Sequence, residues 1–366
     1  MPQPNAAPLP YQPHFEQLEK DEAETTRELV ETLRSIAETV LKDSGQALRG
    51  VHAKSHGLLH GQLTVLPGLP PTLAQGLYAT PATYPAILRF STNPGDVLDD
   101  SISVPRGLAI KIMGVEGERL PDAAGDSQDY VMVNGPAFAA PNARKFLGNL
   151  KLLAKTTDTP QVLKKAVSAT LRGAERVLES LGGESTTLKS MGGHPNTHIL
   201  GETFYTQAPL LHGPYIAKLS IAPATQALRA LTDQHIHTSG RPDALREELS
   251  EFIAREGGEW EVRVQLCTDL DSMPIEDASV VWPEDASPYV TVARITVPPQ
   301  SGWSEERSRL VDDGVSFSPW HGLAAHRPLG SIMRVRKTSY EASVAFRSSH
   351  GRCPVHEPRG DLPLPA

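Results

Sequence analysis

Three strand-like segments follow one another between residues 61 and 113, with turn-forming residues between them. Residues 61–65 alternate between the two faces of a strand, and residues 86–91 and 107–113 also have strand character within a stretch, 49–132, that favours β structure. Glycine, proline and aspartate separate these segments and no helical pattern intervenes. Successive strands are therefore expected to pair antiparallel, and the βαβ alternation of a doubly wound parallel sheet is excluded.

Helical spacing marks several other segments. Leu29, Leu33 and Ile36 lie on one face of an amphipathic helix predicted over residues 15–43. Further helices are predicted at residues 141–154, 160–181, 242–256 and 333–347, and further strands at 215–221, 261–268 and 289–297. This order of strands, helices, strands and a final helix predicts the α+β class.

The segments also suggest a division of the chain of 366 residues. Residues 1–44 form a Pro-rich arm followed by the amphipathic helix, and residues 45–350 form one core. Residues 351–366 form an irregular Pro-rich tail.

Charge and cysteine content limit the possible partners and compartment. Lys and Arg total 35 against 43 Asp and Glu, a net charge of −8, which disfavours nucleic acid and anionic membrane surfaces as partners. No apolar run is long enough to span a bilayer, and the N-terminus lacks the pattern of a signal peptide. Two cysteines do not make a disulfide framework. We therefore expect a cytoplasmic protein.

Histidines at positions 52, 56 and 60 offer one possible metal site. On a helix, a spacing of four residues would place three imidazoles on one face, an arrangement that suits a metal. Gly57 and Gly61 favour a strand or loop instead, where this spacing loses its meaning. The metal site is therefore the minor alternative.

The C-terminal helix carries a less ordinary pattern. Arg336, Tyr340 and Arg347 are separated by four and seven residues, which places all of them on one helix face to within roughly 40°. A nearby guanidinium stabilises a phenolate over a phenol, and a tyrosine phenolate is a known axial ligand of haem iron. The alternative is an exposed tyrosine flanked by arginines on a solvated face.

Five short motifs decide between these alternatives, because together and in order they resemble the catalase superfamily. They are Arg49-Gly-Val-His-Ala-Lys54, Arg89-Phe-Ser-Thr92, Pro105-Arg-Gly-Leu-Ala-Ile-Lys111, Val133-Asn-Gly-Pro-Ala-Phe138 and Arg336-Lys-Thr-Ser-Tyr340. The resemblance extends over roughly residues 45–350. It implies a catalase-like antiparallel β-barrel with surrounding helices and a buried haem b (iron protoporphyrin IX).

The resemblance also implies roles on the distal side of the haem. His52 would be the distal acid/base, oriented by Ser91, with Val51 as the small apolar residue beside it. Asn134 would be the second distal polar group, although its alignment requires a one-residue gap. Phe146 would stack on the distal haem face.

On the proximal side, Tyr340 would be the iron ligand, and Arg336 would keep it as the phenolate. Arg49, Arg89 and Arg347 match the arginines that pair with the haem propionates. Propionates in a low-dielectric interior require such charged partners.

The short tail after Arg347 points to the small catalase-related branch of haem hydroperoxidases. The implied function is a haem-dependent peroxidase or catalase that heterolyses hydrogen peroxide or organic hydroperoxides through a ferryl intermediate. One alternative is a fatty-acid hydroperoxide-rearranging enzyme resembling allene oxide synthase, for which the helices at 141–154 and 160–181 would line a wider channel. The other is a haem-binding protein without turnover. The expected partner is a small-molecule peroxide, and a homodimer is plausible.

Overall fold

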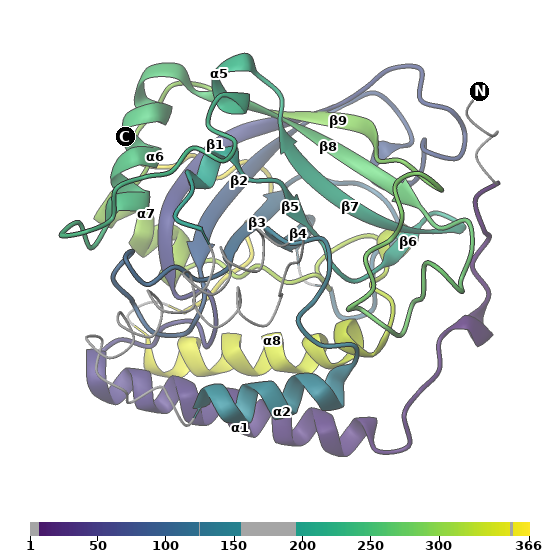
Figure 1. Cartoon of the computed structure of the whole chain (residues 1–366), viewed down its shortest axis with the longest axis horizontal. Coiled ribbons are helices and arrows are strands. Elements are labelled where there is room, and N and C mark those ends of the chain that lie inside the picture. Colours follow the sequence, from purple (N-terminus) through teal and green to yellow (C-terminus); the bar gives the residue numbers. More distant parts are fainter. Residues whose placement is uncertain (1–6, 124, 155–194, 352–353) are drawn as a thin grey trace, which may run out of the picture.

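The strands close into an antiparallel barrel (Figure 1). The computed structural model describes residues 7–123, 125–154, 195–351 and 354–366. Strands pair in the order β5-β4-β3-β2-β1-β9-β8-β7, and β7 pairs with β5 to close the ring of eight, while β6 extends from β7. The strands are β1 (Lys54–Val65), β2 (Thr83–Thr92), β3 (Arg106–Ile112), β4 (Gln128–Val133), β5 (Phe204–Tyr205), β6 (Leu210–His212), β7 (Tyr215–Pro223), β8 (Gly258–Leu266) and β9 (Val290–Val297). The predicted antiparallel barrel with surrounding helices is confirmed.

Helices cover the outside of the barrel. They are α1 (Glu22–Ser44), α2 (Ala143–Ala154), α5 (Gln226–Arg229), α6 (Ala244–Glu256), α7 (Glu305–Ser308) and α8 (Ser331–His350). Helices α1, α2 and α8 lie together below the barrel in Figure 1, and α6 lies beside it. The helix predicted at residues 160–181 falls outside the described residues.

The barrel interior is filled by side chains from successive strands. Phe90 of β2 packs edge-on against Phe204 of β5, with ring centroids 5.8 Å apart, and lies 6.1 Å from Trp260 of β8. All three side chains are fully buried. Such aromatic pairs contribute about 0.5–1.5 kcal/mol beyond the burial of their area. Strands distant in the chain are thereby held in one ring.

The apolar stripe of the first predicted helix is a packing surface. Leu29 and Ile36 of α1 form a buried cluster with Leu147 of α2 and Val335 of α8. Gly45, with a φ of 70°, ends α1 in the left-handed conformation that glycine adopts without steric cost. This layer forms one wall of the cavity described below.

Helix α1 begins later than predicted, at Glu22 rather than near residue 15. The reason is that Glu16 is held by the rest of the molecule: its carboxylate lies 2.9 Å from Arg327 and 3.0 Å from Arg334. Its carboxylate also accepts the backbone N–H of Gly330. These contacts hold the segment before Glu22 against the core in a non-helical path.

The C-terminal segment 354–366 has no regular structure but packs along the barrel. Glu357 lies 2.6 Å from Lys111 of β3, which also pairs with Asp129 of β4 at 2.9 Å. Farther on, the carbonyl of Pro365 accepts a hydrogen bond of 2.6 Å from Arg307. The irregular tail is thus attached to the core, and the three-part division of the chain stays a prediction.

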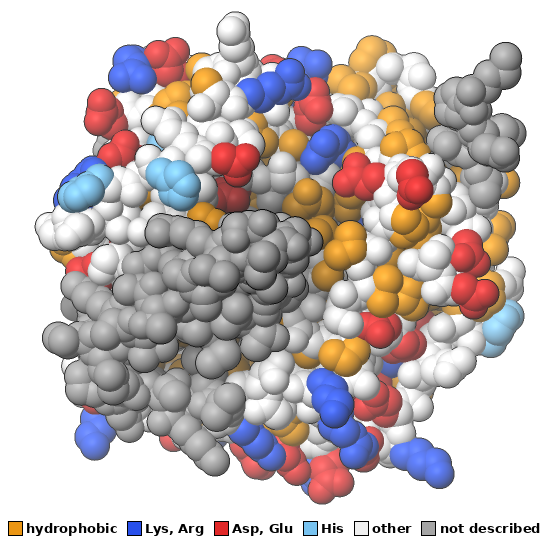
Figure 2. Space-filling view, in the orientation of Figure 1, with side chains coloured by type: hydrophobic (Ala, Val, Ile, Leu, Met, Phe, Trp, Pro, Cys, Tyr) orange, Lys and Arg blue, Asp and Glu red, His pale blue; other side chains and the backbone are white. Residues whose placement is uncertain are grey.

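Acidic and basic side chains are interspersed over the face shown in Figure 2. Among the described helices, none combines the length and the apolar content that a bilayer crossing requires.

Candidate active site

A cavity of about 530 Å³ lies between the barrel wall and helices α1 and α8. The barrel wall contributes residues of β2, β3 and β4, α1 contributes an apolar strip, and α8 contributes most of its second half. Of the predicted site residues, those that line the cavity are Arg49, Val51, His52, Arg89, Ser91, Tyr340 and Arg347. Asn134, Phe146 and Arg336 are not among the described residues of its lining.

His52 lies just before β1 in a strained backbone conformation. Its φ is 52°, a left-handed value that is uncommon outside glycine and often marks functional positions. Its Nδ1 lies 3.3 Å from the Ser91 hydroxyl, as the predicted orienting contact requires. Burial, followed by the charges on Arg89 and Arg336, lowers the pKa of His52 from 6.5 to about 3. The imidazole is therefore neutral near pH 7.

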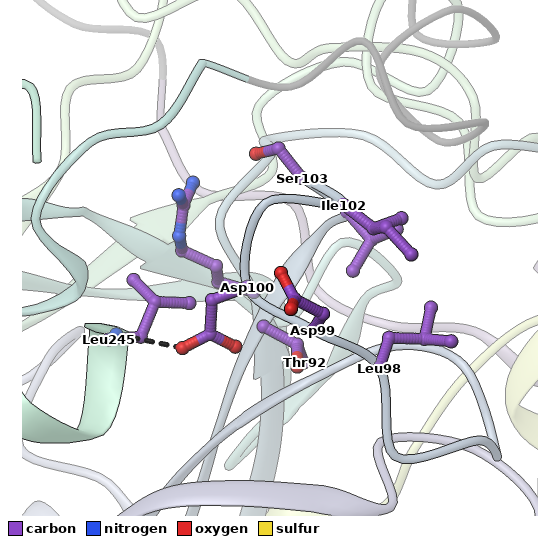
Figure 3. Close-up of a pocket in the computed structure, with 9 residues that line it drawn as sticks. Thr92, Leu98, Asp99, Asp100, Ile102, Ser103 and Leu245 are labelled. Carbon is purple, nitrogen blue, oxygen red and sulfur yellow. Dashed lines mark hydrogen bonds between the residues drawn. The ribbon is translucent and has the colours of Figure 1, made fainter. Parts of the chain in front are cut away.

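The loop after β2 supports the segment that carries His52. The N–H of Ala53 donates to the carbonyl of Pro94 at 3.1 Å. Lys54 forms a buried ion pair of 2.8 Å with Asp100. The other carboxylate oxygen of Asp100 accepts the N–H of Leu245 from α6 at 2.8 Å, which is the dashed line in Figure 3. The small cavity beside this pair measures about 10 Å³, close to the room one water needs. The pair therefore fixes the loop rather than forming a ligand site.

Gly107 of β3 has a role that the sequence analysis missed. A Cβ atom added there would lie 2.6 Å from His52 Nδ1 and 2.9 Å from Ser91 Oγ. Only glycine at this position leaves room for the imidazole and its hydroxyl partner. The signal in the sequence was a glycine inside a strand pattern, which often marks a close approach of another group.

Gly107→Ala is accordingly expected to displace the His52 imidazole or the Ser91 hydroxyl. It should lower the rate of a reaction in which His52 takes part by about 10²-fold, because a displacement of roughly 1 Å in a reacting group costs that much. The matched control is Gly148→Ala in α2, where an added Cβ meets nothing within 4 Å. Steady-state turnover and haem content of both variants check the prediction. Equal activity of the two variants would contradict the role given to Gly107.

Tyr340 projects into the cavity from α8. Among the described residues, none forms a hydrogen bond with its hydroxyl group. The predicted partner Arg336 donates to the sulfur of Met333 at 3.4 Å and lies 5.2 Å from the centroid of the Phe138 ring. The structure thus leaves the phenol oxygen available to a ligand, whereas a direct contact with Arg336 stays a prediction.

The three remaining arginines meet at one end of the cavity. Arg49 and Arg347 both donate to the carbonyl of Asp312, at 2.7 and 2.9 Å, and Arg89 contacts the Asp312 carboxylate at 2.6 Å. Arg347 is 5% exposed, and its buried Nε has no hydrogen-bond partner among the described residues. Burial and the charge on Arg89 lower the pKa of Arg347 to about 10. The three arginines were predicted from the sequence, whereas Asp312 was not.

Asn134 and Phe146 lie apart from this arrangement. The carboxamide of Asn134 accepts the N–H of Arg106 at 2.9 Å and donates to Glu202 at 3.2 Å. Phe146 packs edge-on against Phe138 with centroids 5.0 Å apart. Their assigned distal roles stay predictions, and Glu202 engages the amide that would have to reach the peroxide.

The three regularly spaced histidines do not form a site. His56 is buried against Thr92, with 2.9 Å between the ring nitrogen and the hydroxyl, and His60 contacts Asp361 at 2.6 Å. Only His52 of the three lines the cavity. In a strand, a spacing of four residues separates side chains by more than 10 Å, which is why the pattern does not make a ligand set.

A different group of possible ligands, Asp129, His321 and Glu357, brings its ligand atoms within 4.8 Å of one another. The ammonium group of Lys111 lies 2.9 Å from Asp129 and 2.6 Å from Glu357, and it supplies the positive charge that these carboxylates require. The group is therefore satisfied as an ion-pair network.

The cavity residues fit an iron porphyrin. The cavity volume falls within the range of 300–1,000 Å³ that is typical of ligand pockets. Tyrosine is a known axial ligand of haem iron, and arginines are suitable partners for its two carboxylates. The buried Nε of Arg347 at this end of the cavity has no hydrogen-bond partner within the described ranges, and an anionic ligand would explain this observation.

The structure is similar to those of known catalases. It matches catalase A from Saccharomyces cerevisiae with a TM-score of 0.61 and 17% identity, covering 89% of this chain and 67% of that one. It matches a fungal catalase with a TM-score of 0.57 and 17% identity, covering 87% of this chain and 63% of that one. The chain thus spans about two thirds of the length of these catalases. No family model and no curated protein matches the sequence. At 17% identity the likeness shows a catalase-like fold, and the fold implied by the five motifs is confirmed.

Proposed function

We propose that this protein is a haem-dependent peroxidase with catalase activity that cleaves hydrogen peroxide or organic hydroperoxides. The observation that carries the proposal is one cavity in a catalase-like fold. It is lined by a neutral histidine, three arginines and a tyrosine whose hydroxyl has no hydrogen-bond partner in the part of the chain that the structure describes. When bound, the haem supplies the redox chemistry that splits the O–O bond. Tyr340 would ligate its iron, and Arg49, Arg89 and Arg347 would hold its carboxylates.

His52 would move the proton. Ser91 Oγ lies 3.5 Å from the carbonyl of Gly107, to which it donates its own hydrogen, so its oxygen can accept a hydrogen bond from a protonated His52 Nδ1. This tautomer leaves Nε2 as the base. Nε2 then takes the proton from one peroxide oxygen and returns it to the leaving oxygen, as a general base and acid in turn.

One feature of the cavity favours organic hydroperoxides as a second class of substrate. Val30, Leu33 and Ala37 of α1 add an apolar wall that a hydrogen peroxide molecule does not require. A fatty-acid hydroperoxide would bury its chain against such a wall. Rearrangement of such a substrate, without net reduction, is therefore the alternative function. A homodimer and a cytoplasmic location stay predictions.

Three assays on the haem-loaded protein separate these functions. Oxygen release from hydrogen peroxide indicates catalase activity, and peroxide-dependent dye oxidation indicates peroxidase activity. Consumption of a fatty-acid hydroperoxide without a reductant indicates rearrangement. We expect dye oxidation to occur together with some oxygen release. Haem-loaded protein that is inactive in all three assays would contradict an enzymatic function.

A further inference from the structure

Asp312 lies on an unusual backbone turn beside the cavity. Residues Arg309–Asp313 form a single π-helical turn directly after α7, and such turns are rare and concentrate at functional sites. The carbonyls of Val311 and Asp312 accept hydrogen bonds from Arg49, and the carbonyl of Asp312 also accepts one from Arg347. The turn therefore gathers two guanidinium groups from distant parts of the chain.

The carboxylate of Asp312 brings in the third arginine. It lies 2.6 Å from Arg89 Nε and 3.4 Å from Arg49 Nη1, and it accepts hydrogen bonds from the hydroxyls of Ser55 and Ser308 at 2.6 and 2.8 Å. The side chain is 13% exposed. Burial alone would raise the pKa of Asp312, but the charges on Arg89 and Arg49 and the Ser55 hydroxyl hold it below its usual value. The group is thus a carboxylate near pH 7.

This contact places a carboxylate of the protein on the arginines that line the cavity. Arg49 and Arg89 would otherwise face an anionic ligand with their full charge. Burial, followed by the charges on Arg347 and Arg89, lowers the pKa of Arg49, so the neighbouring guanidinium groups disfavour its charge. The Asp312 carboxylate thus occupies Arg49 and Arg89 in the lining of the cavity. The buried Nε of Arg347, in contrast, has no hydrogen-bond partner among the described residues.

We propose that Asp312 is a built-in counter-anion that competes with the carboxylates of the ligand for Arg49 and Arg89, and so sets how tightly the cavity binds an anionic porphyrin. In the protein without ligand, Asp312 would hold the three arginines in place. When a ligand binds, its carboxylates must compete with Asp312 for these arginines, and their binding is therefore weaker. The inference rests on the proposed haem site. It concerns the balance of charge at that site and not the reaction.

The test uses protoporphyrin IX without iron and its dimethyl ester, so that the readout is binding and not activity. Dissociation constants are measured by quenching of tryptophan fluorescence for the wild type and for Asp312→Asn, which removes the charge with little change of shape. We expect the diacid to bind at least fivefold more tightly to Asp312→Asn than to the wild type, and the dimethyl ester to bind both equally. Glu305→Gln is the control, because this exposed carboxylate of α7 loses the same charge away from the cavity.

The outcomes separate the inference from the proposed function. Binding of the diacid to the wild type with no gain in Asp312→Asn overturns the inference alone, as does an equal gain for the ester. No binding of either porphyrin to the wild type overturns the haem site itself. If Asp312→Asn does not fold when empty, it is refolded with each porphyrin: recovery with the diacid alone supports the inference, and recovery with neither or with both contradicts it.

Discussion

Replacement of His52 by alanine is expected to lower peroxide turnover by about 10²–10⁴-fold while the protein still binds haem, because a positioned acid/base contributes that factor. His52 lines the cavity, contacts Ser91 at 3.3 Å and is neutral near pH 7. The cavity lining includes two histidines, His52 and His350. The substitution removes the one that contacts Ser91 and leaves His350, Tyr340 and the arginines in place. Turnover per bound haem is the quantity to measure.

The chain offers a matched control in β1, the strand that follows His52. His60→Ala removes an imidazole that contacts Asp361 on the outside of the barrel and does not line the cavity. We expect this variant to keep its turnover. A His52→Ala protein as active as His60→Ala would show that the proton transfer has been assigned to the wrong residue.

The second large effect is a loss of stability in mild acid. Burial is the main cause that lowers the pKa of five histidines, to about 3 for His52 and His326, to about 4 for His198 and His212, and well below 6.5 for His56. The unfolded chain binds protons at these positions as the pH falls below about 6.5, whereas the folded protein does not until its own lower pKa values are reached. The stability from keeping these groups neutral is complete above pH 6.5 and decreases below it, by up to about 1.4 kcal/mol per pH unit for each histidine.

Denaturant unfolding at pH 7.5, 6.0 and 5.0 measures this effect on the wild type and on His326→Gln. Glutamine can still accept the N–H of Leu77, which donates to the ring of His326 at 2.9 Å. We expect the free energy of unfolding to fall steeply from pH 6 to pH 5. In the variant its slope should be smaller by about 1.4 kcal/mol per pH unit, because the variant takes up one proton fewer when it unfolds. Wild-type stability that is flat over this range would contradict neutral burial of these histidines.

The fold was predictable where local pattern and tertiary role agree. Strands β2, β3 and β7–β9 and helices α2, α6 and α8 have the periodicity that their burial requires, and they were predicted near their observed bounds. Strand β1 begins at Lys54, well before the predicted segment 61–65, and α1 begins later than predicted. Strands β5 and β6 have two and three residues and are too short to show a period. The start of α1 depends on ion pairs of Glu16 with residues more than 300 positions away, and no local signal contains that information.

The candidate site was predictable in part for a similar reason. Arg49, His52, Arg89, Tyr340 and Arg347 fall within short motifs or at a regular offset from them, and the structure brings them to one cavity. Asp312 lies in a Val-Asp-Asp-Gly segment that has the composition of an ordinary turn, and only the three-dimensional arrangement shows that it holds the arginines.

The assignment of Asn134 has a different difficulty. It rested on an alignment with a gap, and its amide lies against Glu202 rather than in the lining of the cavity. A motif shows the order of residues along a strand. It does not show which residue forms hydrogen bonds with a given side chain, because that partner can come from any part of the chain.

The most direct test of the proposed haem site is the absorption spectrum of the haem-loaded protein and of its Tyr340→Phe variant. We predict one ferric haem per chain in the wild type, with a phenolate-to-iron charge-transfer band that is lost when Tyr340 becomes phenylalanine. A wild-type protein that takes up no haem, or a spectrum that Tyr340→Phe leaves unchanged, would contradict the proposed site.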